Sequence, residues 1–254
     1  MLGPWITSHF PTHRVYTEAF GGGASVLLRK ARSYAEVYND LDGELVNLFR
    51  VMRDQGDELQ RLIELTPFAR DEFDLSYTVV DDPVEQARRT LVRSHMGFNA
   101  SVVGNTGFRS DTTRPYSTPS HNWSKLPEQM MAITERLRGV VLDNRAGIDV
   151  IRAHDAVDTL HYVDPPYLSS ERSRWGGYKH EMTEDDHVAL ADALHEIEGM
   201  VVLSGYDSPL YDDQYAGWRK IKRQSHADGA RARVEVLWLS PSAEAQQPQI
   251  SIAI

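Results

Sequence analysis

The sequence predicts an α/β protein whose mostly parallel sheet is flanked by helices. Three observations support this fold class. Short runs rich in β-branched and aromatic residues alternate with longer stretches whose apolar residues recur at helical spacing. The first such run leads directly into three consecutive glycines, as in a strand–turn–helix unit. The last two runs, 221–224 and 234–239, flank Asp228-Gly229 and have the pattern of a closing antiparallel pair.

The first third of the chain contains two strand–helix units. The predicted elements are a strand at 15–20, a helix-compatible stretch at 24–30, a strand at 36–38 and a helix at 44–65. The first strand is followed by Gly21-Gly22-Gly23, and the second ends at Asn39-Asp40. This order is typical of a parallel sheet, because parallel neighbours need crossover connections.

An irregular segment then interrupts the pattern. Asp82-Pro83 is a helix-start signal, and residues 84–96 are predicted to be helical. Residues 97–123 are rich in Gly, Ser, Thr and Asn and fit no plain helix. The α/β pattern resumes with strands at 140–142, 160–163 and 200–203, and with a helix that starts at the capping-box sequence 183–186 and ends at Gly199.

Length and composition fit one large domain that carries a smaller one. The chain has 254 residues, of which 41% are apolar and 25% charged. Residues 1–75 and 139–254 are assigned to the main domain and residues 76–138 to an insertion. No apolar run approaches the ~20 residues that cross a bilayer, and the N-terminus lacks the pattern of a secretory signal. A cytoplasmic protein with no membrane partner is expected.

The absence of cysteine excludes several kinds of site. With Cys at 0, disulfide scaffolds, thiolate zinc sites, iron–sulfur clusters and thiol nucleophiles are ruled out. Cytosine C5-methylation and zinc-dependent base deamination, as usually built, lose a required residue. The 10 histidines show no metal-ligand spacing, so no metal is expected.

Charge is distributed unevenly along the chain. The formal net charge of −10 argues against a protein that coats polyanions by its bulk charge. Residues 83–125 nevertheless carry more Lys and Arg than Asp and Glu, for a local charge of +4. Arg88, Arg89 and Arg93 fall within one and a half helical turns, where they either contact phosphates or form a solvated face.

The glycine turn at residues 21–23 suits a nucleoside ligand. A strand that ends in glycine lets backbone pass close to a ligand, and a carboxylate about 20 residues on, here Asp40, can accept from ribose hydroxyls. A tight turn without a ligand explains the same residues. The dinucleotide pattern Gly-x-Gly-x-x-Gly is incomplete, which disfavours NAD.

The sharpest signal is Asp164-Pro165-Pro166-Tyr167, directly after a predicted strand. This loop suits alkylation of an exocyclic amine, whose lone pair is delocalised into its ring. A carboxylate and a backbone carbonyl that accept the two N–H groups favour the pyramidal nitrogen needed for attack. Proline supplies a rigid carbonyl without a donor, and tyrosine supplies a face on which a base can stack. A strand stopped by prolines, with Asp164 as a local cap, is the structural alternative.

These segments also carry a family resemblance. In order along the chain, they resemble the motifs of Dam-type (D12 class) DNA adenine N6-methyltransferases, especially phage-like members. The segments are YTEAFGGGASV (16–26), VYNDLD (37–42), DPPY (164–167), LSGY (203–206) and EVLWL (235–239). The resemblance implies a Rossmann-like class I methyltransferase sheet with an inserted, mainly helical target-recognition domain at 76–138.

The resemblance also implies a cofactor, a substrate and residue roles. S-adenosylmethionine is the implied cofactor, double-stranded DNA the implied partner, and a monomer is favoured. The implied cofactor contacts are Glu18, Phe20, Gly21, Gly22, Gly23, Asp40, Asn144 and Asp164, with Asp40 on the ribose. The implied catalytic residues are Asp164, Pro165, Pro166 and Tyr167, around the target amine of a flipped adenine. The implied DNA contacts are Arg88, Arg89, Arg93, Asn99, Arg109 and Arg114.

Two departures from the family pattern keep other readings open. The family usually opens with a Gly-Gly-Lys segment, whereas this sequence begins at Leu2-Gly3-Pro4-Trp5, and Ala19 stands where proline is common. The Asp-Pro-Pro-Tyr chemistry serves any exocyclic amine, so an RNA or cytosine-N4 methyltransferase is one alternative. A catalytically silent remnant that binds DNA or cofactor is another, suggested by the missing lysine segment and the net charge of −10.

Overall fold

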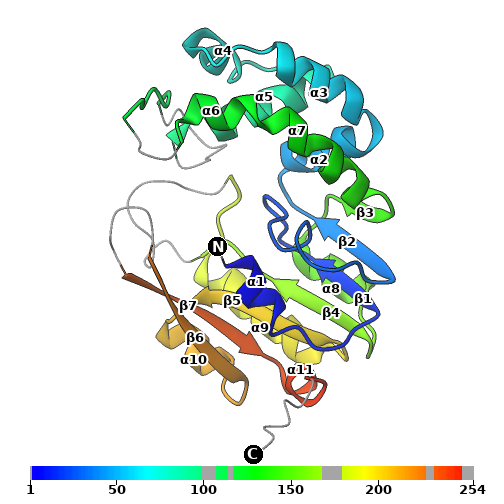
Figure 1. Ribbon diagram of the computed structural model, residues 1–254. Helices are drawn as coiled ribbons and strands as arrows, with labels where there is room; N and C mark the ends of the chain where they lie inside the picture. Colours follow the sequence, from blue (N-terminus) through cyan, green and yellow to red (C-terminus); the bar gives the residue numbers. More distant parts are fainter. Residues whose placement is uncertain (1, 99–106, 114–116, 168–178, 227–231, 248–254) are drawn as a thin grey trace, which may run out of the picture. The chain divides into compact units, whose positions relative to one another are not determined.

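A computed structural model describes residues 2–98, 107–113, 117–167, 179–226 and 232–247 of the chain (Figure 1). The chain forms two compact units. The first, here called the sheet unit, comprises Met1–Leu41, Asp143–Arg172 and Met182–Ile254, and the second, the helical unit, comprises Asp42–Leu142 and Ser173–Glu181.

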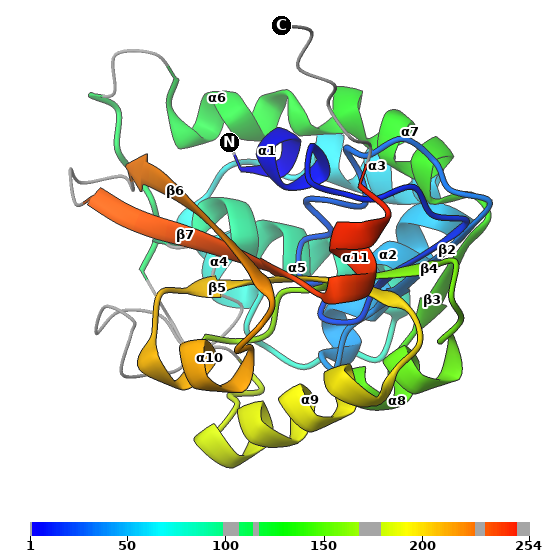
Figure 2. The same ribbon diagram turned by 90° about the horizontal axis from the view of Figure 1, so that it is seen from below.

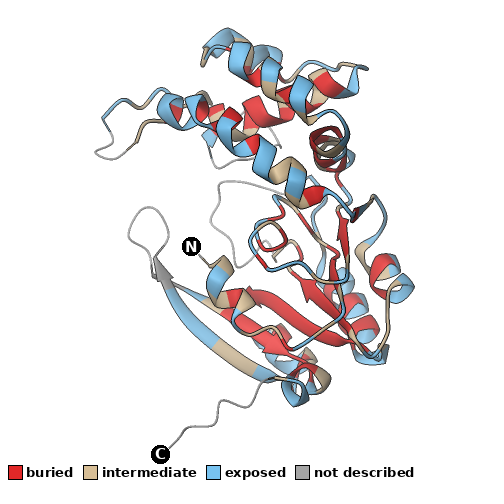
Figure 3. Ribbon diagram, turned by 45° about the vertical axis from the view of Figure 1, so that its right-hand side comes forward, coloured by how far each residue is buried: buried red, intermediate tan, exposed pale blue. Residues whose placement is uncertain are grey.

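The sheet has seven strands and is mostly parallel, as predicted. The strands are β1 (Val15–Glu18), β2 (Ala35–Asn39), β3 (Val140–Asp143), β4 (Thr159–Val163), β5 (Met200–Tyr206), β6 (Arg219–His226) and β7 (Ala232–Leu239). They lie in the order β3-β2-β1-β4-β5-β7-β6. Strands β2, β1, β4 and β5 are parallel, whereas β7 runs antiparallel to both β5 and β6. The central strands are buried, while β6 is largely solvent-accessible (Figure 3).

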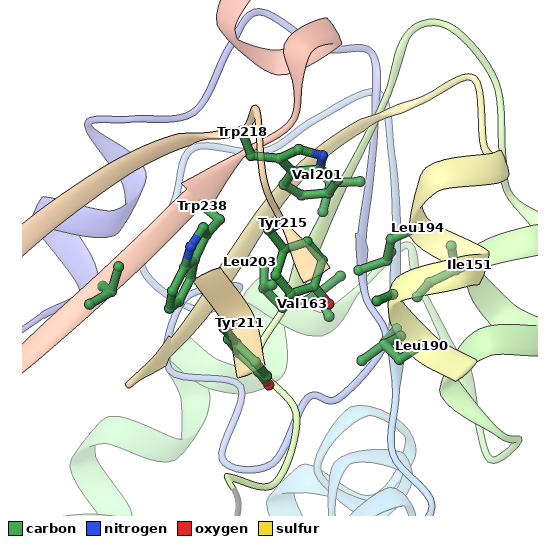
Figure 4. Close-up of a cluster of buried hydrophobic side chains, with 13 residues drawn as sticks. Ile151, Val163, Leu190, Leu194, Val201, Leu203, Tyr211, Tyr215, Trp218 and Trp238 are labelled. Carbon is green, nitrogen blue, oxygen red and sulfur yellow. The ribbon is translucent and has the colours of Figure 1, made fainter. Parts of the chain in front are cut away.

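Helices cover the sheet and bury its apolar face. Those of the sheet unit are α1 (Gly3–Thr7), α8 (Gly147–Ala153), α9 (Glu184–Glu196), α10 (Pro209–Gln214) and α11 (Pro241–Ala245). Figure 2 shows α8, α9 and α10 on one face of the sheet. Their apolar side chains, among them Ile151, Leu190 and Tyr211, pack against Val163, Leu203 and Trp238 of the strands (Figure 4).

The helix-compatible stretch 24–30 forms turns in place of an α-helix. Ala24 takes a left-handed conformation with φ of 51°. The Leu27 amide donates to the Glu18 carboxylate at 2.8 Å, so it does not pair with the carbonyl four residues back as a helix requires. The buried acid therefore competes successfully with helix formation at this point.

The helical unit contains α2 (Gly43–Asp54), α3 (Gly56–Leu65), α4 (Arg70–Leu75), α5 (Pro83–Met96), α6 (Pro119–Ser124) and α7 (Leu126–Leu137). The helix predicted over 44–65 is thus two helices, broken at Gln55, whose ψ is 36°. A Cβ at Gly56 would lie 2.5 Å from Thr134 Oγ1, so the break lets α3 approach α7 closely. The predicted insertion at 76–138 lies inside this unit, which also includes α2, α3 and α4.

Within the part of the chain that the structure describes, every helix is too short or too polar to cross a bilayer.

Candidate active site

The glycine turn follows β1 and is held against β2. The Gly21 amide donates to the Asn39 carbonyl at 2.8 Å, and a Cβ on Gly21 would lie 2.1 Å from the Tyr38 ring. Only glycine fits there. Gly22 has φ of +49°, which favours glycine, and its carbonyl accepts from the Tyr38 hydroxyl at 2.7 Å. Apart from its chain neighbours, no described residue has an atom within 4 Å of the point where a Cβ on Gly23 would stand.

Asp40 meets the glycine turn, although it lies on the next strand–helix connection. Its Oδ2 accepts from the Gly22 amide at 2.8 Å. The side chain of Asn144 donates to the carbonyls of Asp40 and Leu41, at 2.7 and 3.2 Å. The structure therefore brings together three of the positions predicted to hold a cofactor.

Two further side chains connect this region. Asn39 is fully buried; its amide donates to the carbonyls of Ala19 and Arg145, and its Oδ1 accepts from the Arg145 amide at 2.9 Å. Phe20 covers the start of α8, because a Cβ on Gly147 would lie 2.6 Å from the Phe20 ring. Asn39 was not predicted as a site residue. The sequence feature that could have identified it is an asparagine directly before an acidic residue at the end of a buried strand.

Glu18 lies at the end of β1 with 2% of its surface exposed. Its Oε2 accepts from the Tyr16 hydroxyl at 2.9 Å and from the Leu27 amide at 2.8 Å. Burial raises the pKa of Glu18 to about 8, the two hydrogen bonds oppose this rise, and the negative charge of Asp164 adds to it. Both of these hydrogen-bond donors are groups of the protein, so the role of Glu18 as a direct cofactor contact stays a prediction.

The Asp-Pro-Pro-Tyr loop (residues 164–167) follows β4. Asp164 Oδ1 accepts from the Tyr167 hydroxyl at 2.8 Å, and Oδ2 from the Tyr162 hydroxyl at 3.3 Å. The Ser204 hydroxyl is a further hydrogen-bond partner of the Asp164 carboxyl group. Burial raises the pKa of Asp164, and these hydrogen bonds hold the rise in check. The carboxyl group is thus fixed from both sides.

Tyr162 and Ser204 are functional candidates that the predictions had missed. Tyr162 precedes Asp164 by two residues, and side chains two residues apart along an extended chain point to the same face of the sheet. Ser204 belongs to β5 and follows Leu203, which pairs with Val163 of β4. The first was recognisable from strand periodicity, but the second depends on the register between two strands.

The glycine turn and the Asp-Pro-Pro-Tyr loop leave neighbouring strands at the same edge. Strands β1 and β4 are parallel neighbours, with Glu18 opposite Tyr162 (Figure 1). Ligands of open α/β sheets bind outside the carboxyl ends of the strands, so this edge is the expected location of a site. It combines a backbone cradle with a fixed acid, rigid proline carbonyls and an aromatic ring.

The arginines predicted to contact DNA form ion pairs within the helical unit. Arg88 binds Glu85 at 2.6 Å and Glu72 at 2.8 Å, and Arg89 binds Glu85 at 2.6 Å. Arg93 pairs with Glu44. These guanidinium groups are largely buried beside carboxylates, so in this structure their charges stabilise the helical unit. Their phosphate contacts stay a prediction.

The other predicted DNA contacts are less well defined. The Arg109 amide donates to the Met96 carbonyl at 2.7 Å, next to an isolated bridge between Gly97 and Phe108. Asn99 and Arg114 lie outside the described residues. Among the described residues, no cluster of three or more His, Asp or Glu side chains could hold a metal ion.

Known proteins match this chain over most of its length. The family model of the D12 class N6 adenine-specific DNA methyltransferases matches residues 1–227. The Type II methyltransferase M1.LlaDCHI of Lactococcus lactis subsp. cremoris is 28% identical over 235 residues, covering 85% of this chain and 81% of the relative.

Proposed function

The chain belongs to the D12 class of N6 adenine-specific DNA methyltransferases, and from that premise we propose which of its residues bind the cofactor and which hold the base. The resemblance drawn from the motifs is confirmed, and the activity is site-specific methylation of adenine N6 in DNA. The single observation that carries the residue assignment is the edge where the glycine turn and the Asp-Pro-Pro-Tyr loop leave β1 and β4 side by side.

The glycine turn fits S-adenosylmethionine. Within the described parts of the chain, no atom beyond the immediate chain neighbours lies within 4 Å of a Cβ position at Gly22 or Gly23, so a ligand can approach the backbone there. Asp40 is fixed to the turn through the Gly22 amide, which supports its proposed role as the acceptor from ribose hydroxyls. Phe20 and Asn144 border the same turn. When bound, S-adenosylmethionine supplies an electrophilic methyl group.

The Asp-Pro-Pro-Tyr loop prepares the amine. Asp164 accepts one N–H of the adenine amino group, a proline carbonyl accepts the other, and the Tyr167 ring stacks on the base. Both acceptors favour a pyramidal nitrogen with an available lone pair. Bonds to Tyr167 and Tyr162 fix the Asp164 carboxylate, so little reorganisation is needed when charge develops on the nitrogen.

Proton balance assigns different states to the two acids, Glu18 and Asp164. The methylated nitrogen carries a positive charge and loses a proton, for which an Asp164 oxygen is the adjacent acceptor. Two neighbouring carboxylates would repel each other. With its pKa near 8, Glu18 is mainly protonated at pH 7 and leaves the negative charge to Asp164. This separation of pKa values is the usual basis for distinct roles of paired acids.

The helical unit is proposed to recognise the target sequence, with residues 76–138 as the recognition element. A paired adenine is shielded, so it must leave the duplex, which costs a few kcal/mol that protein contacts offset. Because Arg88, Arg89 and Arg93 are held by acidic partners, we expect base readout to involve other side chains of the insertion.

The experiment is transfer of labelled methyl groups to unmethylated duplex DNA, followed by digestion to nucleosides. We expect label in N6-methyladenine with the wild-type chain and at least a hundredfold less with Asp164→Ala. Asp192→Ala, at an exposed acid of α9, is the matched control and should keep wild-type activity. Label in N4-methylcytosine, or full activity of Asp164→Ala, would contradict the assignment.

A further inference from the structure

Asn39 is the last residue of β2, and its side chain is fully buried. Strand β2 lies between β3 and β1 in the sheet (Figure 1). The side-chain nitrogen of Asn39 donates to the carbonyl of Ala19, the first residue after β1, at 2.8 Å. It also donates to the carbonyl of Arg145, two residues beyond the end of β3, at 3.0 Å. One side chain thus connects the carboxyl ends of three neighbouring strands.

The three partners of the Asn39 amide fix its orientation. The Ala19 and Arg145 carbonyls can only accept, so the two N–H groups of the side chain face them. The Arg145 amide can only donate, and it donates to Asn39 Oδ1 at 2.9 Å. A side chain of this length that offers two donors and one acceptor is an asparagine, since aspartate lacks the donors and leucine lacks both kinds of group. The pattern of partners therefore calls for an amide at this position.

Phe20 lies between two groups that Asn39 holds. The Ala19 carbonyl accepts from the Asn39 side chain, and the Gly21 amide donates to the Asn39 carbonyl at 2.8 Å. These two groups belong to the planar peptide units on either side of Phe20, and φ and ψ of Phe20 are the only soft rotations between those units. With both units held, the backbone of Phe20 and the direction of its Cα–Cβ bond are fixed.

Asn144 is held through its chain neighbour, Arg145. The Arg145 amide and carbonyl are both bonded to the Asn39 side chain. The amide shares a planar peptide unit with the Asn144 carbonyl, so one end of the Asn144 backbone is fixed. The Asn144 side chain in turn donates to the carbonyls of Asp40 and Leu41, at 2.7 and 3.2 Å. These contacts form a closed ring between the end of β2 and the connection after β3.

Asp40 follows Asn39 directly and completes the arrangement. Its Oδ2 accepts from the Gly22 amide at 2.8 Å, so its side chain is tied to the connection after β1. Phe20, Asp40 and Asn144 are three of the proposed cofactor contacts, and each is a chain neighbour of Asn39 or of a residue that Asn39 bonds. Contacts that are fixed before the ligand arrives bind it more tightly, because less conformational freedom is lost on binding.

We propose that Asn39 is a positioning residue for S-adenosylmethionine: its buried amide holds three connections so that Phe20, Asp40 and Asn144 meet one ligand in a fixed arrangement. Asn39 acts through these neighbours and not through contact with the reacting atoms. This inference rests on the proposed cofactor role of the three residues. It assigns tight cofactor binding to a side chain behind the site, and its loss should therefore appear in cofactor affinity before it appears in kcat.

The experiment compares variants of the full chain by calorimetric titration with S-adenosylhomocysteine. Asn39→Ala removes all three side-chain hydrogen bonds. Asn39→Asp keeps the outline of the side chain and an acceptor oxygen, but it removes both donors and places oxygen against two carbonyls. Thermal unfolding, kcat, and the KM values for S-adenosylmethionine and for DNA are measured on the same samples.

Asp155→Ala is the matched control at the opposite edge of the sheet. Asp155 also joins two connections through its side chain, because its oxygens accept from the Glu198 and Gly199 amides at 2.9 and 2.8 Å. These connections precede β4 and β5, so they lie at the amino ends of the strands. A loss of stability should appear in both Asn39→Ala and Asp155→Ala, whereas a loss of cofactor affinity should appear only in Asn39→Ala.

We expect Asn39→Ala to weaken the affinity for S-adenosylhomocysteine by about 10- to 100-fold, the usual effect of losing a partner that orients a ligand-binding group. Asn39→Asp should bind no better than Asn39→Ala, although it fills more space, because its oxygens leave two buried carbonyls without donors. The KM for S-adenosylmethionine should rise, while kcat at saturating substrates and the KM for DNA stay within about threefold. Asp155→Ala should keep cofactor affinity within about twofold, since distant sites act independently.

Three outcomes would overturn the proposal. They are wild-type cofactor affinity in Asn39→Ala, clearly tighter binding in Asn39→Asp than in Asn39→Ala, and an equal loss of affinity in Asp155→Ala. Asn39→Thr keeps the inference testable where the other two Asn39 variants do not fold, because threonine favours strands. Its single hydroxyl replaces at most one of the two donors, so we expect about a 10-fold loss of affinity, and wild-type affinity would count against the role of the amide.

Failure of the proposed function gives a different result. If the glycine turn does not bind the cofactor, Asp40→Ala will keep wild-type affinity for S-adenosylhomocysteine, whatever the Asn39 variants do. If Asp40→Ala loses affinity and the Asn39 variants do not, the proposed cofactor site stands and only the positioning role of Asn39 is wrong.

Discussion

Strands β1 and β4 each carry a tyrosine near the carboxyl end, and an acid follows that tyrosine two residues later. Tyr16 donates to Glu18 at 2.9 Å, and Tyr162 donates to Asp164 at 3.3 Å. Glu18 is the last residue of its strand, whereas Asp164 lies one residue beyond the end of β4. Because of this difference of one position, Glu18 belongs to a residue that pairs with the neighbouring strand, whereas Asp164 begins the loop that follows β4.

The second partner of each acid shows the consequence. Glu18 is almost completely buried and accepts from the Leu27 backbone, so its carboxyl group organises the chain after the glycine turn. Asp164 is partly accessible and bonds to side chains, Tyr167 and Ser204. The same local pattern therefore supports the fold at the end of β1, and at the end of β4 it holds the acid that we propose takes part in methyl transfer.

The sharpest test of this contrast is one substitution made at both acids. Asp164→Asn retains the shape and an acceptor oxygen but removes the negative charge, so we expect methylation to fall by about 10²- to 10³-fold. Glu18→Gln should lower it by less than tenfold. Single-turnover methylation at saturating DNA measures both. Equal losses would show that the two acids act as one catalytic unit.

The pH dependence of stability gives the next largest effect. The pKa of Glu18 is raised from 4.5 to about 8, so the folded state binds its proton more tightly than the unfolded chain. Stability from this group is complete below pH 4.5 and is lost as pH rises through 8. We expect its contribution to the free energy of unfolding to be about 3 kcal/mol smaller at pH 9 than at pH 6.

Urea unfolding of the wild-type chain and Glu18→Gln at these two pH values isolates the effect. The Gln variant has no proton to lose at this position. Between pH 6 and pH 9 its free energy of unfolding should therefore fall by about 3 kcal/mol less than that of the wild-type chain. Asp192→Asn, at an exposed acid, should follow the wild-type curve. Parallel curves for wild type and Glu18→Gln would mean that Glu18 is ionised in the folded protein at neutral pH.

The glycine turn provides a smaller, steric test of the β1 end. Gly21→Ala would place a methyl group 2.1 Å from the Tyr38 ring, so we expect a loss of about 1–3 kcal/mol in stability. Gly23→Ala places its methyl group where no described residue other than the chain neighbours lies within 4 Å, so it should change stability by less than about 0.5 kcal/mol. A reduced affinity of Gly23→Ala for S-adenosylhomocysteine would mark Gly23 as the cofactor approach, while a stable Gly21→Ala would contradict the close packing.

Much of this arrangement was predictable from local sequence pattern. The strands, the glycine turn and the Asp-Pro-Pro-Tyr loop lie in short segments whose composition determines them. Helix formation over 24–30 was wrong, because the competing partner of Leu27 is a buried acid on the preceding strand. After the break at Gln55, Gly56 lies so close to Thr134 of α7 that a Cβ would not fit, and this long-range contact is not visible in the local sequence.

The unpredicted parts of the site depend on long-range pairing. Ser204 reaches Asp164 because β5 lies beside β4 in a particular register. Arg93 pairs with Glu44, which lies 49 positions earlier in the chain. Periodicity shows which face a side chain takes, but it does not show which distant side chain will meet it.

The two tyrosines give the smallest and most closely matched comparison. Both are buried, and their rings lie at almost equal distances from Phe10, 5.7 Å for Tyr16 and 5.8 Å for Tyr162. Replacing either with phenylalanine keeps the ring packing and removes one hydroxyl. We expect each change to cost about 1 kcal/mol in stability, the usual net value of one hydrogen bond.

Their effects on methylation should differ. Tyr162→Phe removes a donor to Asp164, so the carboxylate loses one of its constraints, and we expect the single-turnover rate to fall about threefold. Tyr16→Phe leaves Glu18 bonded to the Leu27 amide, and the rate should stay within 1.5-fold of wild type. Equal rate losses in the two variants, each in proportion to its loss of stability, would contradict this expectation. The Tyr162 hydroxyl would then contribute no more to methylation than the Tyr16 hydroxyl does, and the rate would depend on packing alone.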